Sequence, residues 1–136
     1  MEFTHEHKEI ARTYQRIIEE EFNPKVDQWE SEEVFPAHEV MKTLGNAGLL
    51  GISKPVEYGG LGLNFSYEIA GVEQLGRLKA AGVATAIGVQ TLMCTPALAK
   101  HGSDELRREF LAPSIAGDQV GCIGVSEEGA GSDVAS

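Results

Sequence analysis

The sequence predicts a mainly α-helical protein whose last twenty or so residues begin a β-structure. Apolar residues recur at three- and four-residue spacing through most of the first 115 residues. Prolines and glycines divide this region into short helices, and the helical period is lost from residue 119 onward. A chain of 136 residues has room for one domain and the start of another.

The first predicted helix covers residues 4–22, where Ile10, Tyr14 and Ile17 share one face. Thr4 is a suitable N-cap because its hydroxyl can accept from a backbone N–H that the first turn leaves unpaired. We expect Pro24 to end this helix or to begin a short successor over residues 25–33.

A second helix is predicted to begin near Pro36 and to end at Gly48, which can adopt the left-handed conformation typical of a C-cap. A glycine-rich loop follows over residues 57–63. Asn64 or Ser66 is then expected to cap a helix that continues to about residue 78.

Residues 81–92 form a predicted helix that is small and nearly uncharged, so we expect it to be buried on several sides. Pro96 should begin another short helix over residues 97–100. Polar side chains in this region either bond to backbone carbonyls one turn earlier or line a cavity, and the sequence does not separate the two; they are Gln90, Thr91 and Thr95.

Ser103 is predicted to cap the last helix, with Leu106, Phe110 and Leu111 facing inward. Pro113 and Gly117 should close the helical region. Since residues 119–125 show a β-like pattern and a stable sheet generally needs three or more strands, we expect partner strands beyond residue 136.

Charge and composition exclude several classes of function. A net charge of −10 disfavours nucleic-acid binding, which requires a basic surface. No apolar run approaches the roughly 18 residues of a membrane span, and acidic residues near the N-terminus disfavour a targeting signal. Cys94 and Cys122 are expected to be reduced core residues of an intracellular protein. No metal site is expected at His5 and His7, because residues this close together in a helix do not face each other and so cannot share one metal ion.

The loop formed by Gly129, Ala130, Gly131 and Ser132 is the strongest candidate for chemistry. Glycines allow a ligand to approach the backbone closely, and successive N–H groups with a serine hydroxyl suit phosphate oxygens. A tight turn without a ligand explains the same residues. The motif is neither a P-loop nor a dinucleotide-binding fingerprint.

The chain resembles the acyl-CoA dehydrogenase family. The thirteen residues 124–136 fit the family's first signature stretch, and residues 48–62 and 100–117 carry supporting motifs in the family's order. The resemblance implies a flavoenzyme that oxidises an acyl-CoA thioester to the trans-2-enoyl-CoA. It also implies an N-terminal α-helical bundle domain, residues 1–116, and the beginning of a middle β-domain of β-barrel-like form, residues 117–136.

The resemblance further implies roles for individual residues. Ile123, Val125, Ser126, Gly131 and Ser132 would bind FAD, the two apolar residues through their backbone groups. The acyl-CoA substrate would contact Ser132 and the wall formed by Gln90, Thr91 and Thr95. Glu128 departs from the family, which commonly has proline there, so the rigidity of this loop is in question.

No catalytic residue is assigned within residues 1–136, because the family's base is a glutamate farther along the chain; the chain alone is therefore expected to be inactive. The resemblance implies electron-transfer flavoprotein or a similar acceptor as partner and a dimer or tetramer at full length. The location would be the mitochondrial matrix in a eukaryote and the cytoplasm in a bacterium. Two alternatives remain: a non-catalytic helical module that binds acyl-CoA or a partner, and an acyl-CoA oxidase on the same scaffold.

Overall fold

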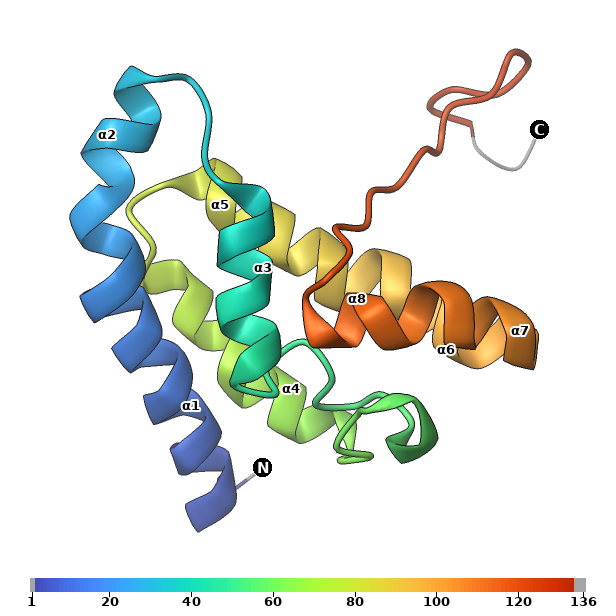
Figure 1. Ribbon diagram of the computed structural model, residues 1–136, viewed down its shortest axis with the longest axis horizontal. Helices are drawn as coiled ribbons and strands as arrows, with labels where there is room; N and C mark the ends of the chain where they lie inside the picture. Colours follow the sequence, from blue (N-terminus) through green and yellow to red (C-terminus); the bar gives the residue numbers. More distant parts are fainter. Residues whose placement is uncertain (1, 134–136) are drawn as a thin grey trace.

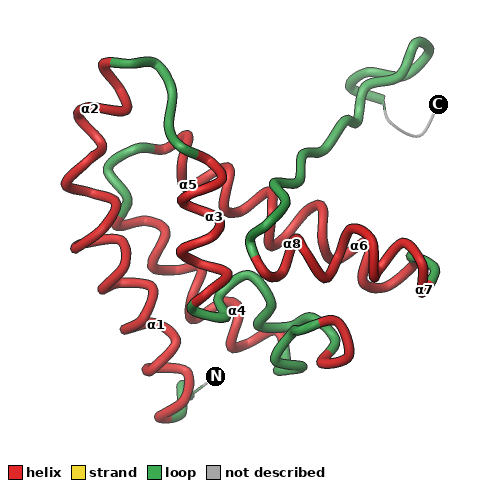
Figure 2. Tube along the Cα trace, viewed as in Figure 1, coloured by secondary structure: helices red, strands yellow, loops and turns green. Residues whose placement is uncertain are grey.

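A computed structural model describes residues 2–133 of the chain. Within these residues the secondary structure is helical and contains no strand, which confirms the predicted mainly α-helical class (Figures 1 and 2). The helices pack into one body, and the chain after residue 117 leaves this body as an extended tail (Figure 1).

The first helical segment is continuous from residue 5 to residue 31. It consists of α1 (His5–Ile17), a π turn (Ile18–Phe22), a 3₁₀ turn (Asn23–Lys25) and α2 (Val26–Ser31). Thr4 is the N-cap, as predicted. Of the two alternatives for Pro24, the short successor helix is confirmed, since the 3₁₀ turn that contains Pro24 leads directly into α2.

The next helices surround the glycine-rich loop. α3 (Ala37–Asn46) begins after Pro36 and is followed by Gly48, whose φ of +74° confirms the predicted left-handed end. A 3₁₀ turn (Val56–Tyr58) precedes α4 (Phe65–Val72), which continues as a 3₁₀ turn (Glu73–Arg77). The Asn64 side chain caps α4 by accepting from the Ser66 N–H at 3.0 Å.

Two further continuous segments complete the helical body. One consists of α5 (Ala81–Gly88), a π turn (Val89–Cys94) and α6 (Thr95–His101); the other of α7 (Asp104–Leu106), a π turn (Arg107–Leu111) and α8 (Ala112–Ala116). Pro96 lies in the first turn of α6, which ends at His101, and this confirms the predicted short helix. The predicted burial of Leu106 and Phe110 is wrong, because both are about 40% exposed. The predicted cap at Ser103 and the burial of Leu111 are confirmed.

In the part of the chain that the structure describes, each of the three π turns ends two residues before a proline: Pro24, Pro96 and Pro113. Proline has no N–H for the carbonyl one turn earlier, and its ring collides with that carbonyl in a regular α-helix. A wider turn ahead of the proline relieves the collision and lets the helix continue. Each proline therefore stands in the first turn of the next helical stretch, and the segment continues through it.

The main core lies between the first helical segment, α3, α4 and α5. Helix α1 approaches α4 so closely that a Cβ at Gly71 would lie 2.6 Å from the Tyr14 ring. The Tyr14 hydroxyl donates to the Leu49 carbonyl at 3.2 Å, and burial raises the pKa of this phenol. The largest side chains that are fully buried in this core are Tyr14, Ile17, Ile18, Met41, Leu44, Leu50, Ile52 and Ile87.

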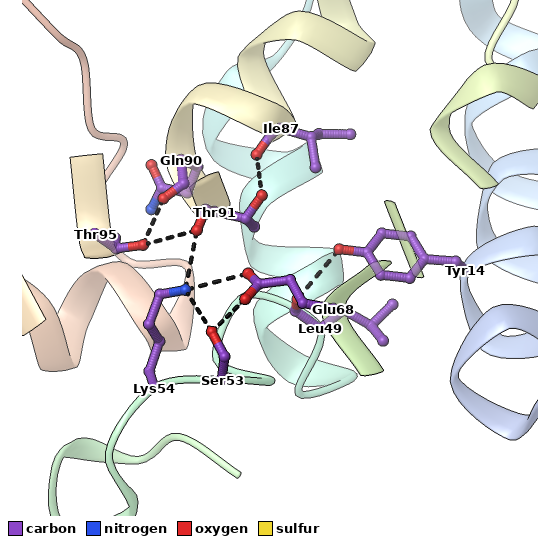
Figure 3. Close-up of polar contacts among 9 residues, drawn as sticks. All are labelled: Tyr14, Leu49, Ser53, Lys54, Glu68, Ile87, Gln90, Thr91 and Thr95. Atoms are coloured by element: carbon purple, nitrogen blue, oxygen red, sulfur yellow. Dashed lines mark hydrogen bonds and ion pairs between the residues drawn. The ribbon is translucent and has the colours of Figure 1, made fainter. Parts of the chain in front are cut away.

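A buried ion pair crosses the interior beside this core (Figure 3). The Lys54 Nζ lies 3.1 Å from Glu68 Oε1, and the two side chains are only 2% and 3% exposed. The lysine also donates to the Ser53 hydroxyl and to the Thr91 carbonyl, at 3.1 and 2.9 Å. Ser53 in turn donates to the second oxygen of Glu68. All three ammonium donors and both carboxylate oxygens thus have partners, as buried charges require.

The Thr91 carbonyl needs this partner because of Pro96. In the π turn, a carbonyl accepts from the N–H five residues later, and five residues after Thr91 stands the proline. Lys54 replaces the missing donor, and the Thr95 hydroxyl lies 3.4 Å from the same oxygen. The ion pair therefore ties the loop after α3, helix α4 and the π turn together.

The segment Ala81–His101 is long and apolar enough, by length and composition alone, to cross a membrane. The sequence prediction did not anticipate this, because it divided the segment at Pro96. Core helices of water-soluble proteins pass the same test. Here α6 packs against the π turn Arg107–Leu111, and the absence of a membrane span stays a prediction.

The substitution Gly45→Ala should strongly destabilise the fold, because its Cβ would overlap the Ala116 carbonyl and lie 2.7 Å from the Gly117 nitrogen. Both are backbone atoms, so we expect a loss of about 3 kcal/mol in the free energy of unfolding, measured by urea titration. Gly82→Ala is the matched control, since nothing lies within 4 Å of its Cβ position in α5. It should stabilise slightly, by about 0.5–1 kcal/mol. Equal stability of Gly45→Ala and the wild type would contradict the close packing of α3 against the end of α8.

Lys54→Met should destabilise the fold by about 3–5 kcal/mol, because Glu68 would remain buried without its cation. Replacing both residues, as Lys54→Met with Glu68→Leu, should cost less than Lys54→Met alone. Arg77→Met serves as the control: its partner Glu19 and Arg77 are both nearly half exposed, so the loss should stay below about 1 kcal/mol. A double variant less stable than Lys54→Met would show that the pair is not the source of the effect.

Candidate functional site

The three polar residues predicted to line a cavity lie on the π turn Val89–Cys94 and the first turn of α6 (Figure 3). All are buried: Gln90, Thr91 and Thr95 are at most 3% exposed. The Thr91 hydroxyl donates to the Ile87 carbonyl at 2.9 Å, and the Thr95 hydroxyl donates to the Gln90 carbonyl at 2.7 Å. Bonding to carbonyls about one turn earlier, one of the two open alternatives, is thus observed for Thr91 and Thr95 but not for Gln90. Contact with an acyl chain stays a prediction.

The Gln90 side chain connects the π turn to the end of the helical body. Its Nε2 donates to the carbonyls of Ser114 and Gln119, each at 3.1 Å. Its Oε1 accepts from the Gly121 N–H at 2.6 Å. The amide therefore fastens the first residues of the tail to the buried turn.

The exit of the chain from α8 is held just before this point. Gly117 has a φ of +76°, and a Cβ there would overlap the Met41 carbonyl, so α8 ends directly against α3. The Lys42 ammonium donates to the Ala116 carbonyl at 3.2 Å and pairs with Asp118 at 2.5 Å. The helical body thus determines where the tail begins.

Residues 122–126, which carry most of the predicted cofactor contacts, lie in the open. Ile123 and Val125 are 45% and 51% exposed, and Ser126 is exposed. Within residues 2–133 the backbone groups of this stretch make no hydrogen bond. The stretch is extended without a strand partner, so the beginning of a β-domain stays a prediction.

The glycine-rich loop forms a tight turn. The N–H of Glu127 donates to the Ala130 carbonyl at 2.8 Å, and the reverse bond measures 3.2 Å. At Gly129 and Gly131 nothing lies within 4 Å of a Cβ position, so the approach to the backbone is open. The last three residues of the motif, Val134, Ala135 and Ser136, lie outside the described residues.

These residues fit the contacts that FAD would require. Open backbone groups at 122–126 suit a flavin ring edge, and the exposed hydroxyls of Ser126 and Ser132 supply neutral donors. Glu127 and Glu128 add negative charge to the same loop. A pyrophosphate would therefore be held by N–H and O–H groups, since this loop has no cationic side chain.

The structure also shows where the two cysteines and the histidines near the N-terminus lie. Cys94 is half-buried and Cys122 is exposed, so neither is a core residue, contrary to prediction. Burial raises the pKa of the Cys94 thiol, which disfavours a nucleophile. His7 is buried, stacks on the Tyr67 ring and bonds to the Ser66 hydroxyl at 2.8 Å. Among the described residues no group of three potential metal ligands occurs.

Surface depressions occur away from the tail. Two adjoining ones, of about 290 and 380 Å³, share Trp29, Val34 and Phe35 at the end of α2. A third, of about 250 Å³, lies between Lys54 and Pro96 beside the buried ion pair. None of them includes a predicted FAD-binding residue, since the tail is an open chain.

Comparisons with known proteins agree with this arrangement. The family model described as "Acyl-CoA dehydrogenase, N-terminal domain" matches residues 4–118. The short-chain specific acyl-CoA dehydrogenase of Homo sapiens mitochondria is 34% identical over 134 residues, which are 98% of this chain and 32% of that protein. Isovaleryl-CoA dehydrogenase of Pongo abelii mitochondria is 33% identical over 132 residues, 96% of this chain and 31% of that protein.

The helical body also resembles solved structures. An acyl-CoA dehydrogenase from Bacillus anthracis, complexed with FAD, superposes with a TM-score of 0.88 at 30% identity, covering 98% of this chain and 22% of that one. A glutaryl-CoA dehydrogenase from Mycobacterium smegmatis in complex with FADH2 gives 0.86 at 28% identity, covering 98% and 34%. The chain spans about a third of the length of the curated relatives it matches. By the match over residues 4–118, the chain belongs to the acyl-CoA dehydrogenase family and contains its N-terminal helical domain.

Proposed function

We propose that this chain is the N-terminal part of a flavin-dependent acyl-CoA dehydrogenase that oxidises an acyl-CoA thioester to the trans-2-enoyl-CoA. One observation carries the proposal: the family-matched helical domain, residues 4–118, leads directly into an exposed segment with open backbone groups and a glycine-rich turn. When bound, FAD would supply the hydride acceptor for this oxidation.

The segment's own residues would hold the cofactor. Ile123 and Val125 would contact the flavin through backbone groups, and the Ser126 hydroxyl would donate to the ring. Gly131 and Ser132 would contact the FAD pyrophosphate, and Ser132 would also contact the acyl-CoA substrate. Donors fixed at a flavin ring stabilise the negative charge that develops there during reduction.

The wall of the acyl-chain cavity would include the π turn that carries Gln90, Thr91 and Thr95. Because these polar groups are bonded to the protein's own backbone, the turn would present carbon atoms to the acyl chain and would not compete for hydrogen bonds with it. The length of acyl chain accepted would then depend on the remaining walls.

The 136-residue chain by itself would be catalytically inactive. Glu68 is buried against Lys54 and is therefore unsuited to remove a proton from a thioester, while Glu127 lies on the exposed turn. The base would be a glutamate farther along a longer protein.

The electron acceptor of the full-length enzyme would be electron-transfer flavoprotein or a similar protein, and the active form would be a dimer or tetramer. Its location would be intracellular, as for its relatives named mitochondrial.

We expect the longest reading frame that contains this sequence to copurify with flavin and to lose its absorption near about 450 nm when an acyl-CoA is added without oxygen. Butyryl-CoA and isovaleryl-CoA are the first substrates to test, and the 136-residue chain is the control that should give no reaction. A long protein without flavin would contradict the proposal and favour a non-catalytic module. Rapid reoxidation by oxygen would favour an oxidase.

Ser126→Ala should weaken FAD binding to that longer protein about fivefold, since one hydrogen bond contributes about 1 kcal/mol. The measurement is fluorescence titration of the apoprotein with FAD. Ser31→Ala is the matched control, because Ser31 lies exposed on α2 and its hydroxyl bonds only to the Gln28 carbonyl. Equal FAD affinity of Ser126→Ala and the control would remove Ser126 from the site.

A further inference from the structure

We infer that Gln90 is a positioning residue for the cofactor segment: its side-chain amide sets the start and direction of residues 122–126 and so acts on the flavin without touching it. The inference rests on the proposed function in one respect only, that this segment binds FAD. We call the hydrogen bonds of the Gln90 amide to Ser114, Gln119 and Gly121 the amide clamp, and these bonds are present whether or not FAD binds.

The orientation of the Gln90 amide is determined by its partners. Both Nε2 hydrogens are used, toward the carbonyls of Ser114 and Gln119, and Oε1 accepts from the Gly121 N–H. If the amide rotated by 180°, its NH₂ group would face the Gly121 N–H, and its Oε1 would face the carbonyl oxygens of Ser114 and Gln119. Neither contact is a hydrogen bond. Because the side chain is fully buried, water cannot replace these partners, so the arrangement has one stable form.

Within residues 2–133, Gln90 makes the last hydrogen bonds between the helical body and the backbone of the tail. Asp118 and Gln119 donate to the Pro113 carbonyl, and Gln119 and Gly121 then bond to the Gln90 amide. In the described backbone beyond this point, the next bonds join Glu127 and Ala130 to each other. The position of residues 122–126 therefore depends on the position of Gly121.

The fit at Gly121 is close. A Cβ there would lie 3.2 Å from Gln90 Oε1 and 3.3 Å from Cys94 Cβ, so the chain can approach the amide only as glycine without a shift. On the other side, the Thr95 hydroxyl fixes the Gln90 carbonyl at 2.7 Å. Amide, glycine and π turn therefore form one unit, and a displacement of Gly121 moves Ile123, two residues later.

Two variants test the clamp from opposite sides. Gln90→Met keeps a similar volume but removes all three bonds, and Gly121→Ala displaces the tail while leaving the amide intact. Matched controls are Gln74→Leu, a half-buried glutamine that donates to the Ala70 carbonyl and accepts from Arg77 Nε, and Gly82→Ala in α5, where nothing lies within 4 Å of the Cβ position.

The first readout is amide hydrogen exchange in the 136-residue chain. We expect exchange at Gly121 to accelerate by about tenfold or more in Gln90→Met, with exchange at Ile17 in α1 unchanged as evidence that the body stays folded. Gly121→Ala should accelerate exchange at the amide of residue 121 itself, because the added Cβ pushes that N–H away from Gln90 Oε1. Unchanged exchange at Gly121 in Gln90→Met would overturn the inference, and if that variant fails to fold, Gly121→Ala decides.

The second readout is FAD affinity and the visible absorption spectrum of the flavin in the longest protein that contains this sequence. Both clamp variants should lower FAD affinity by about tenfold and shift the flavin spectrum, while both controls should match the wild type. Faster exchange with unchanged affinity and spectrum would refute the positioning role. A wild type that binds no flavin would refute the proposed function, and the exchange data would then still report separately on the clamp.

Discussion

The buried contact between Lys54 and Glu68 is the constraint on which the rest of this structure depends. Pro96 allows the helical segment Ala81–His101 to continue but leaves the Thr91 carbonyl without an N–H partner. A buried carbonyl without a donor costs on the order of 1–3 kcal/mol. The Lys54 ammonium supplies that donor, and Glu68 and Ser53 neutralise and bond the ammonium. The π turn Val89–Cys94 therefore depends for its stability on Glu68 of α4, whose carboxylate balances the charge of Lys54.

The same turn links the packing of the helical body to the tail. With Thr91 fixed from one side, its neighbour Gln90 reaches the carbonyls at the end of α8 from the other. Proline thus has an indirect effect on the candidate site, because it creates the wide turn from which the Gln90 amide projects. Removing the ion pair would loosen a turn that also determines the path of Gly121.

Local sequence rules predict the parts of this fold that depend on neighbouring residues. The caps at Thr4, Asn64 and Ser103 and the left-handed glycine at position 48 follow from interactions within one turn of the chain. The short helices predicted at Pro24 and Pro96 follow from a local rule as well, since proline fits the first turn of a helix.

The buried ion pair and the amide clamp could not be predicted in this way. Lys54 and Glu68 are fourteen residues apart in different elements, and Gln90 and Gly121 are thirty-one apart. Lysine, glutamate and glutamine are typical of exposed positions, and only the packing of the helices brings Lys54, Glu68 and Gln90 to their partners. The candidate FAD residues, by contrast, could be named from a continuous motif, because the loop's chemistry lies in consecutive backbone groups.

The tail explains why that motif predicts chemistry better than it predicts structure. Ile123 and Val125 are about half exposed and their backbone groups are open, so beyond the bond that holds Gly121 no hydrogen bond among the described residues stabilises this stretch. Burying such side chains would contribute about 1.5–3 kcal/mol each, which is the scale on which added strands or a cofactor could order them. The helical domain contributes the starting point, through Gly117 and Gln90. Where the segment begins is thus set by the helices, and the shape it takes depends on what packs against it.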